Sequence, residues 1–285
     1  MAVLATGDGA RDAVEDATRR LRGWHARLTR FDPRSELSHL NSDPRPRVPA
    51  SPILCRFAAA AVAAASRTGG LVDPTLVGEI EAAGYRTHLR GGLPLAASLR
   101  LAPRRQPARP DPRARWRQVV ADVDRGVVSR PHGVRLDTGG IAKGLFADIL
   151  ADRLAGQDAF VVDCCGDLRL GGADGLERTV QVDDPFGRGV LHEFELREGG
   201  VATSGIGRRS WIAAGGRPAH HLIDPSTGLP AYTGVVQATA IAPTAAEAEY
   251  RAKAALLSGP AAAPGWLGHG GAVVFDDGSH HVVER

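Results

Sequence analysis

Hydrophobic residues recur at helical spacing near the start of the chain. Apolar side chains three or four residues apart predict one face of a helix over about residues 12–31, formed by Val14, Ala17, Leu21, Trp24, Leu28 and Phe31. A second, alanine-rich helix is predicted over about residues 53–66, and Gly69 and Gly70 follow its end. Between the two helices lie residues 35–41 and then a proline-rich stretch up to Pro52, which predicts a loop.

From about residue 126 the pattern changes to short runs of β-forming residues. Turn residues separate these runs, as in hairpins and meanders, and the runs lie at residues 126–130, 134–136, 160–163, 179–182, 191–196, 211–213, 222–223, 235–241, 273–275 and 281–283. Two further helices are predicted at about 140–154 and 244–257, the second opening with the capping-box pattern Thr244-Ala-Ala-Glu247. Helices followed by strands predict an α+β fold with mixed or antiparallel sheets. We expect one domain over residues 1–285, with a helical α+β part at about 11–125 packed on a strand-rich part at about 126–285.

Composition and charge favour a globular protein without a nucleic-acid partner. The chain has 285 residues, 43% of them hydrophobic, and a net charge of +3, which is too small to predict a polyanionic partner. Residues 101–117 carry six arginines and one aspartate, but no aromatic ladder accompanies them, so we expect a solvated loop. No apolar run is long enough to predict membrane insertion.

Redox state and targeting signals favour the cytosol. The first residues, Met1–Asp8, have neither a basic region nor a long apolar core, so no signal peptide is predicted. Three cysteines, Cys55, Cys164 and Cys165, cannot form a disulfide framework. We therefore expect a cytosolic protein.

The segment Leu136-Asp-Thr-Gly-Gly-Ile-Ala-Lys-Gly144 is a candidate phosphate site. A short strand is predicted to end at Asp137, and a helix begins soon after Gly139 and Gly140. Such a junction directs backbone N–H groups and a helix dipole at an anion, and Lys143 in the first turn could reach the same anion. The alternative is a plain glycine-rich helix start, because neither the P-loop nor the dinucleotide-binding spacing is present.

Two further segments contain candidate catalytic or binding groups. In Ala219-His-His-Leu-Ile-Asp-Pro225, His220 or His221 could act as a general base, or both could lie on a surface strand. Asp224 could orient an imidazole or form an Asx turn with its own backbone. The small-residue segment Val201–Gly205 is expected to be a turn whose hydroxyls, on Thr203 and Ser204, could contact phosphate or ribose.

Taken together and in this order, the motifs resemble those of a known family. They are Phe31-Asp-Pro-Arg-Ser-Glu-Leu-Ser-His-Leu-Asn41, Gly70-Leu-Val-Asp-Pro-Thr75, the segment at 137–144, Gly166-Asp167, Thr203-Ser-Gly205 and the segment at 220–228. The series resembles the FAD:protein FMN transferases, formerly described as thiamine-biosynthesis lipoproteins. The resemblance implies a flavin-transferase-like α+β fold with the active site in a cleft between two parts. It also implies transfer of FMN from FAD to a Thr or Ser hydroxyl of an acceptor flavoprotein, with release of AMP and usually with Mg²⁺.

The resemblance assigns roles to residues of this chain by position. His221 is expected to be the base on the acceptor hydroxyl, with Asp224 shaping its turn, and Gly140 is expected to offer its carbonyl to the metal. The residues expected to bind FAD are Phe31, Asn41, Leu71, Val72, Asp73, Asp137, Lys143, Thr203, Ser204 and Ile223.

The sequence departs from the family pattern at the expected metal site. Where the family usually has an aspartate and a threonine as ligands, this chain has Glu249 and Lys253. Glutamate can bind Mg²⁺, whereas a protonated lysine has no lone pair to donate. Lys253 either replaces part of the metal's charge in catalysis or forms a surface pair with Glu249; the first reading is supported because 33 of the 35 basic residues are arginine.

Two other departures concern the backbone. Cys164-Cys165-Gly-Asp stands where the family has Gly-Gly-Asp, which is expected either to alter the backbone approach or to place two buried thiols at a strand end. The short N-terminus is expected to lack most of the family's opening strand. Two other functions stay open at this point: an FAD pyrophosphatase giving FMN and AMP, and a non-catalytic flavin-binding protein.

Overall fold

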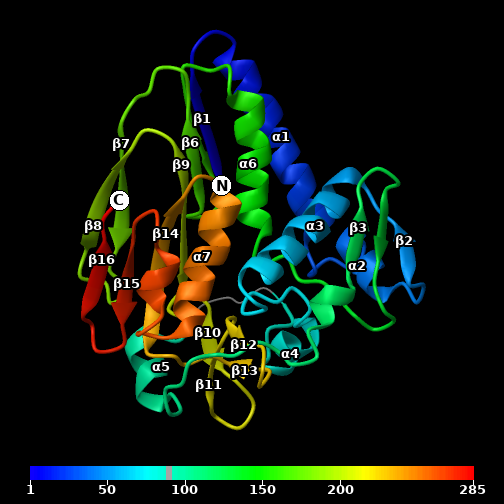
Figure 1. The fold of residues 1–285 in the computed structure, drawn as a ribbon, viewed down its shortest axis with the longest axis vertical. Helices are drawn as coiled ribbons and strands as arrows, with labels where there is room; N and C mark the ends of the chain where they lie inside the picture. The colour runs from blue at the N-terminus through cyan, green and yellow to red at the C-terminus, as the bar shows by residue number, and fades with distance from the viewer. Residues whose placement is uncertain (88–91) are drawn as a thin grey trace.

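An antiparallel sheet of seven strands forms one side of the molecule (Figure 1). The computed structural model describes residues 1–87 and 92–285. The strands follow the spatial order β1-β5-β6-β9-β14-β15-β16. Their bounds are Ala2–Thr6, Ala159–Asp163, Leu168–Gly171, Gly199–Gly205, Val235–Ala242, Gly271–Phe275 and His280–Val283. The long hairpin of β7 (Arg178–Asp183) and β8 (Val190–Leu196) lies beyond the sheet on the side away from the helices (Figure 1).

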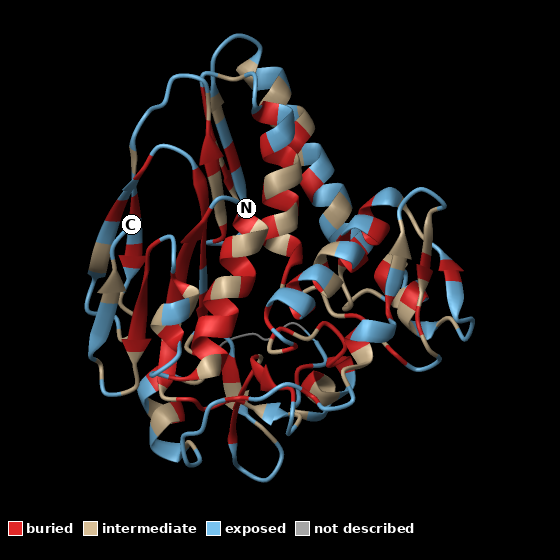
Figure 2. Ribbon diagram, in the orientation of Figure 1, coloured by how far each residue is buried: buried red, intermediate tan, exposed pale blue. Residues whose placement is uncertain are grey.

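Three helices cover the other face of the sheet (Figure 1). They are α1 (Ala10–Leu28), α6 (Ala142–Leu154) and α7 (Ala245–Ser258). Helix α7 contacts α6, β9 and β14 and is buried almost all round, as Figure 2 shows. Glycines permit this close packing: a Cβ on Gly144 would lie 2.5 Å from the Ala245 carbonyl, and one on Gly200 would lie 2.3 Å from the Ala245 nitrogen.

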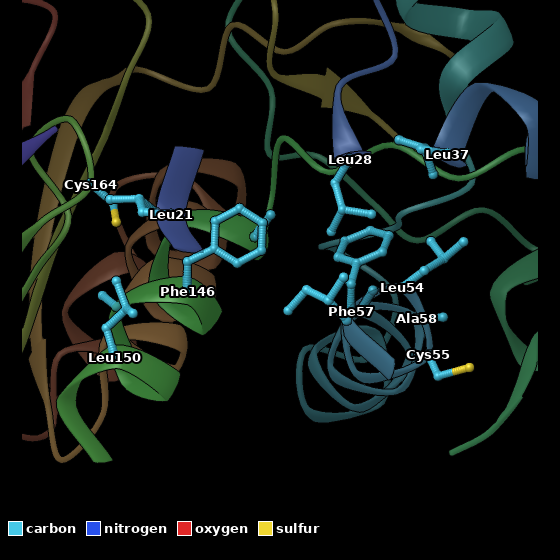
Figure 3. Packing of buried hydrophobic residues seen from close by; sticks show 14 of the residues in the cluster. Leu21, Leu28, Leu37, Leu54, Cys55, Phe57, Ala58, Phe146, Leu150 and Cys164 are labelled. Atoms are coloured by element: carbon cyan, nitrogen blue, oxygen red, sulfur yellow. The ribbon is translucent and has the colours of Figure 1, made fainter. Parts of the chain in front are cut away.

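The predominantly helical part lies beside α6 and α7. It contains α2 (Glu36–Ser42), α3 (Pro52–Arg67) and a small sheet in the order β2-β4-β3, with bounds Arg47–Pro49, Val127–Ser129 and Val120–Asp122. Ser35 and Ser51 cap α2 and α3 by accepting from Ser38 and Leu54 N–H groups. Figure 3 shows how Leu28, Leu54 and Phe57 pack together from α1 and α3.

Short elements close the lower end of the molecule in Figure 1. They are α4 (Val77–Ala82), α5 (Leu95–Leu101), η1 (Arg115–Gln118), β10 (Ser210–Ile212), β11 (Pro218–His220), β12 (Ile223–Asp224) and β13 (Leu229–Pro230). The short helix η2 (Ala263–Trp266) follows α7 and contacts both α7 and β15. Strands β10 and β11 pair with each other, as do β12 and β13.

The fold confirms the predicted α+β class and the four predicted helices, and it corrects several local expectations. The proline-rich loop contains strand β2, and Val201–Gly205 belongs to strand β9 rather than a turn. Residues 134–136 form no strand, whereas β6 was not predicted. Residues 2–6 do form an opening strand, paired along its length with β5. The division into two parts at about residue 125 stays a prediction.

Thr244 caps α7 as the capping box predicts, but the second half of the box is missing. The Thr244 Oγ1 accepts from the Glu247 N–H at 3.2 Å, while the Glu247 carboxylate pairs with Arg251 at 2.7 Å. Asp148 of α6 supplies the remaining acceptors, taking the N–H groups of Ala245 and Ala246. Within the described residues, no helix has the length and apolar character needed to cross a membrane.

Candidate active site

A cavity opens where the N-terminus of α6 meets the end of α1, the segment at 71–76 and the loop after β11. Its walls therefore come from segments far apart in the sequence. Of the residues predicted to act in the site, the cavity is lined by Phe31, Leu71, Val72, Asp73, Asp137, Gly140, Lys143, His221, Ile223 and Lys253. This arrangement places a helix N-terminus, two lysines and a histidine around one space.

The Asp137 carboxylate fixes the turn that leads into α6. Its Oδ1 accepts the Gly139 N–H at 2.6 Å, and its Oδ2 forms an ion pair with Arg30 Nε at 2.7 Å. The Asp137 N–H in turn donates to the Pro74 carbonyl at 2.9 Å. The predicted strand is thus an irregular segment, and both carboxylate oxygens of Asp137 are engaged by the protein.

Arg30 links this turn to a group of aromatic rings. Its guanidinium lies 4.3 Å from the ring centroid of Phe31 and 4.8 Å from that of Tyr85, and it donates to the Tyr85 carbonyl at 2.7 Å. Tyr85 also stacks on Trp211, with 5.6 Å between ring centroids. Phe31 and Tyr85 both line the cavity, so they offer a flat ring of a ligand an apolar, electron-rich wall.

An ion pair between half-buried Lys143 and buried Asp167 lies behind the first turn of α6. Lys143 Nζ is 2.6 Å from Asp167 Oδ2, and the Asp167 side chain is almost fully buried. Burial and the nearby Glu249 carboxylate raise the pKa of Asp167 to about 7, although Lys143 opposes this shift. Burial alone would lower the pKa of Lys143, but the Asp167 and Glu249 carboxylates raise it above its ordinary value. Lys143 is therefore a permanent cation at the edge of the cavity.

Lys253 reaches the same region from α7. Its side chain is buried, with the residue 9% exposed, and its Nζ donates to the Gly139 carbonyl at 2.7 Å. Burial lowers the pKa of Lys253, and Glu249, one helical turn away, opposes this shift. Lys253 is therefore a buried side chain at the turn before α6, and the expectation of a surface pair is wrong.

Glu249 lies deeper than Lys253 and contacts α6. It is 3% exposed, and its Oε2 accepts the Gly144 N–H at 2.8 Å, while its buried Oε1 has no hydrogen-bond partner among the described residues. No group of three or more His, Cys, Asp or Glu side chains in the described parts of the chain could hold a metal ion. The Gly139 carbonyl beside Gly140 is already contacted by Lys253, and the role expected for the Gly140 carbonyl stays a prediction. These residues do not fit a magnesium site.

His221 lines the cavity as a neutral imidazole. Burial lowers its pKa well below the ordinary value, and the positive charges of Arg209 and Lys253 lower it further. Its Nδ1 has no hydrogen-bond partner in the part of the chain that the structure describes. His220, by contrast, is fully buried against Tyr232 and does not line the cavity. The structure thus separates the two adjacent histidines into a cavity residue and a core residue.

Asp73 presents an unused carboxylate oxygen. Its Oδ1 accepts from the Thr75 N–H at 2.7 Å and the Thr75 hydroxyl at 2.6 Å, whereas its Oδ2 is buried without a partner among the described residues. Burial raises the pKa of Asp73. A ligand that donates a hydrogen bond at this wall of the cavity would satisfy that oxygen.

Five of the residues predicted for the site do not line the cavity: Asn41, Thr203, Ser204, Asp224 and Glu249. Asn41 holds the Leu136 backbone instead, donating to its carbonyl at 2.9 Å and accepting its N–H at 2.7 Å. The Thr203 hydroxyl pairs with that of Thr239 in the sheet, at 2.8 Å. Ser204 is buried in β9.

Asp224 forms the Asx turn that the sequence allowed as one of two alternatives. Its Oδ1 accepts from the N–H groups of Ser226 and Arg109, each at 3.0 Å, so it does not orient His221. This carboxylate therefore positions the loop after His221 and ties the arginine-rich segment to it.

The two adjacent cysteines lie in different environments. Cys165 has a φ of 60°, in the left-handed region that glycine usually occupies, and it is exposed and lines the cavity. Cys164 is buried, and burial raises the pKa of its thiol to about 12. The expectation of two buried thiols is therefore wrong for Cys165.

Sequence reasoning missed four cavity or near-cavity residues: Arg30, Tyr85, Asp167 and Arg209. Arg30 immediately precedes the recognised motif at 31–41, and Asp167 lies in the recognised motif Gly166-Asp167, so both positions had a usable signal although neither was assigned a role. Tyr85 and Arg209 lie outside any motif, and only the fold brings them to the cavity.

Comparison with known proteins identifies the family of this chain. The model of the ApbE family matches residues 2–275. A Treponema pallidum protein named FAD:protein FMN transferase is 36% identical over 141 residues, and the one from Rhodobacter capsulatus is 29% identical over 204 residues. These matches cover 45% and 68% of this chain but only 39% and 36% of the relatives' own length.

Solved structures show the same fold over almost the whole chain. The ApbE protein of Thermotoga maritima has a TM-score of 0.77 at 26% identity, covering 99% of this chain and 92% of that one. The apo form of the Pseudomonas stutzeri flavinyl transferase ApbE has a TM-score of 0.74 at 20% identity, covering 97% and 87%. The fold and the family model lead to one conclusion: the chain belongs to the ApbE family.

Proposed function

We propose that this protein is an FAD:protein FMN transferase, which moves FMN from FAD to a Thr or Ser hydroxyl of an acceptor flavoprotein and releases AMP. The observation that carries the proposal is the shared cavity of His221, Lys143 and Lys253 at the N-terminus of α6. A neutral imidazole, fixed ammonium groups and backbone N–H groups are what phosphoryl transfer from a diphosphate requires. The names of the relatives point to the same activity.

The cations of the cavity account for binding of the diphosphate of FAD. Lys143, Lys253 and Arg209 line one cavity together with the glycine turn at 139–140. The α6 N-terminus adds the positive end of its helix dipole. A diphosphate placed there meets positive charge from both the helix and the side chains.

His221 is the proposed base in the transfer step. The acceptor hydroxyl oxygen forms a bond to the phosphorus on the FMN side, and the bond from that phosphorus to the bridging oxygen breaks. AMP leaves with that oxygen and its electron pair, while the hydroxyl proton passes to the His221 imidazole. The lowered pKa of His221 keeps the imidazole unprotonated before substrate binds. The negative charge of a bound diphosphate offsets the Arg209 and Lys253 charges and makes the imidazole a better base.

The aromatic wall and Asp73 are the proposed contacts for the ring systems of FAD. Phe31 and Tyr85 supply apolar ring surface. The unsatisfied Asp73 Oδ2 can accept a hydrogen bond from a ring N–H or amino group. Leu71, Val72 and Ile223 add apolar surface around these groups.

AMP release from FAD, measured with and without an acceptor peptide, tests the proposal. The peptide carries an Asp-x-x-[Ser/Thr]-Gly-Ala sequence, the acceptor motif expected for this family, and a matched peptide has alanine in place of the Ser/Thr. A transferase releases AMP only when the hydroxyl peptide is present. A pyrophosphatase releases AMP even when no peptide is added. FAD binding without AMP release in any condition would contradict both enzymes. The cytosolic location stays a prediction from the sequence.

A further inference from the structure

Lys253 differs from Lys143 and Arg30, two other cations of the cavity, in what it contacts. Lys143 is paired with Asp167 and Arg30 is paired with Asp137. Among the described residues, Lys253 forms no ion pair within 4.0 Å, and its Nζ donates to the neutral Gly139 carbonyl at 2.7 Å. The charges of the other two are compensated by a carboxylate in contact, whereas the charge of Lys253 lies open to a ligand in the cavity.

The position of Lys253 places this charge at the turn that leads into α6. A Cβ built on Gly140 would lie 3.2 Å from the Lys253 Nζ, so the ammonium lies against the backbone of the Gly139–Gly140 turn. The residue is 9% exposed, and it lines the cavity. Holding a buried cation here costs desolvation free energy, which an anionic ligand would recover.

The same helix carries a second cation, half-buried Arg251, whose contacts differ from those of Lys253. Arg251, two residues earlier on α7, pairs with Glu247 at 2.7 Å and donates to the Trp266 carbonyl at 3.1 Å. Lysine occurs only twice in the chain, at 143 and 253, and both side chains line the cavity. A compact ammonium on a flexible stem fits a point-like cation site, whereas the planar arginine fork does not.

We infer that the Lys253 ammonium takes the place of a divalent cation at the diphosphate of FAD, so that FAD binding and turnover need no metal. This inference rests on the proposed function. It also accounts for the poor magnesium donor set, in which Glu249 Oε2 is occupied by the Gly144 N–H and the neighbouring carbonyl is occupied by Lys253. Glu249 then compensates the buried charge of Lys253 from one helical turn away rather than binding an ion.

FAD affinity, followed by quenching of flavin fluorescence, tests the inference without any turnover. The wild-type protein is expected to bind FAD equally well in excess EDTA and in excess MgCl₂. In EDTA, the Lys253→Thr variant is expected to bind about 10- to 100-fold more weakly, the loss typical of a charge-assisted contact. Because threonine restores an oxygen ligand beside Glu249, added MgCl₂ should recover part of that loss in the variant.

Two further variants make this comparison specific. Lys253→Met keeps the stem but has no oxygen ligand, so its loss of affinity should not respond to MgCl₂. Arg251→Gln removes a cation from the same helix without touching the cavity, and it should bind FAD as the wild type does in both conditions. The fold of each variant is checked by its thermal unfolding midpoint.

The outcomes separate the inference from the proposed function. If wild-type FAD affinity or AMP release is lost in EDTA and regained with MgCl₂, the inference that Lys253 replaces the divalent cation is overturned. The proposed transferase function is not affected by that result. A Lys253→Met variant that binds FAD as tightly as the wild type would also overturn the inference. FAD binding that needs Lys253 but no metal would support the replacement of the divalent cation by Lys253. If no AMP is released under any condition in the same experiments, the transferase function is contradicted.

Discussion

Lys143 and Lys253 are the only lysines of the chain, and both line the cavity. Their rarity among 33 arginines could be read from the sequence, and it singled out both positions. Their environments could not be read from it. Lys143 is paired with Asp167, whereas Lys253 contacts a carbonyl, and this difference depends on how α6 and α7 pack.

His221 is predicted to be required for transfer but not for FAD binding. The His221→Asn variant removes the proposed base while keeping a polar side chain of similar size, so transfer should fall by about 10²- to 10⁴-fold. FAD affinity should change much less, because the cations and the aromatic wall are unchanged. Single-turnover AMP release and flavin fluorescence measure the two quantities. Retained transfer in this variant would remove His221 from the mechanism.

His220 is predicted to make the fold sensitive to acid. Burial lowers the pKa of His220 to about 3, so between about pH 6.5 and pH 3 only the unfolded chain takes up this proton. The free energy of unfolding therefore falls as the pH falls through this window, by about 2 kcal/mol between pH 7 and pH 5 for this one group.

Urea unfolding at pH 7 and pH 5 measures this contribution. The His220→Gln variant should lose about 2 kcal/mol less than the wild type between the two pH values. His281→Gln, at an exposed position on β16, is the matched control and should show the wild-type difference. Equal pH dependence in wild type and His220→Gln would show that His220 is not buried as a neutral imidazole.

At the scale of elements, the contact between α6 and α7 positions both lysines. Gly144 lets the first turn of α6 meet the start of α7, and its N–H binds the Glu249 carboxylate. Asp148 of α6 caps α7 through two backbone N–H groups. The geometry at the α6 N-terminus therefore depends on α7, although the two helices are about 90 residues apart in the chain.

Gly144→Ala is predicted to destabilise the protein by about 1–3 kcal/mol, because the new methyl group overlaps the Ala245 carbonyl. Gly23→Ala is the matched control in α1. A Cβ there meets nothing within 4 Å, so this substitution should stabilise the helix by about 0.5–1 kcal/mol. Thermal and urea unfolding measure both changes. A Gly144→Ala variant as stable as the wild type would contradict the close packing of α6 on α7.

The sequence predicted the elements that have a strong local signal. Helices α1, α3, α6 and α7 could be predicted from periodicity and caps, because residues close together in the sequence determine their apolar faces and their ends. The sequence predicts a turn at Val201–Gly205 where the structure has strand β9, because the small residues Gly199–Gly205 resemble loop composition. Those residues are small because α7 packs directly on β9, a tertiary contact that no local pattern records.

Cavity-lining residues that belong to a sequence motif could be predicted. Cavity-lining residues that only the fold brings to the cavity could not. His221, Asp137 and Lys143 were assigned through motifs, and the structure brings them to one cavity. Tyr85 and Arg209 join them from segments without any motif. Asn41 and Asp224 lie in motifs but bind backbone groups, so their place in a motif reflects the shape of the site and not a lining position.

At the scale of the whole molecule, the cavity joins segments from most of the chain, from Phe31 near the start to Lys253 near the end. A ligand bound there contacts the helical part and the residues beside the large sheet at once. FAD at 100 times its dissociation constant should therefore raise the unfolding free energy by about 2.7 kcal/mol, and the unfolding midpoint by about 5–10 °C. Differential scanning calorimetry with FAD, with riboflavin as the phosphate-free control, measures this shift. An equal shift with both would contradict diphosphate recognition.

The most direct test of the transferase is the mass of the acceptor peptide after incubation with FAD and the wild-type protein. The account predicts that the peptide gains one FMN through a phosphoester at its Ser or Thr, with one AMP released for each FMN attached. The alanine-substituted peptide should gain nothing. An unmodified hydroxyl peptide, in a reaction where FAD is bound or where AMP is released, would contradict transfer as the function of this protein.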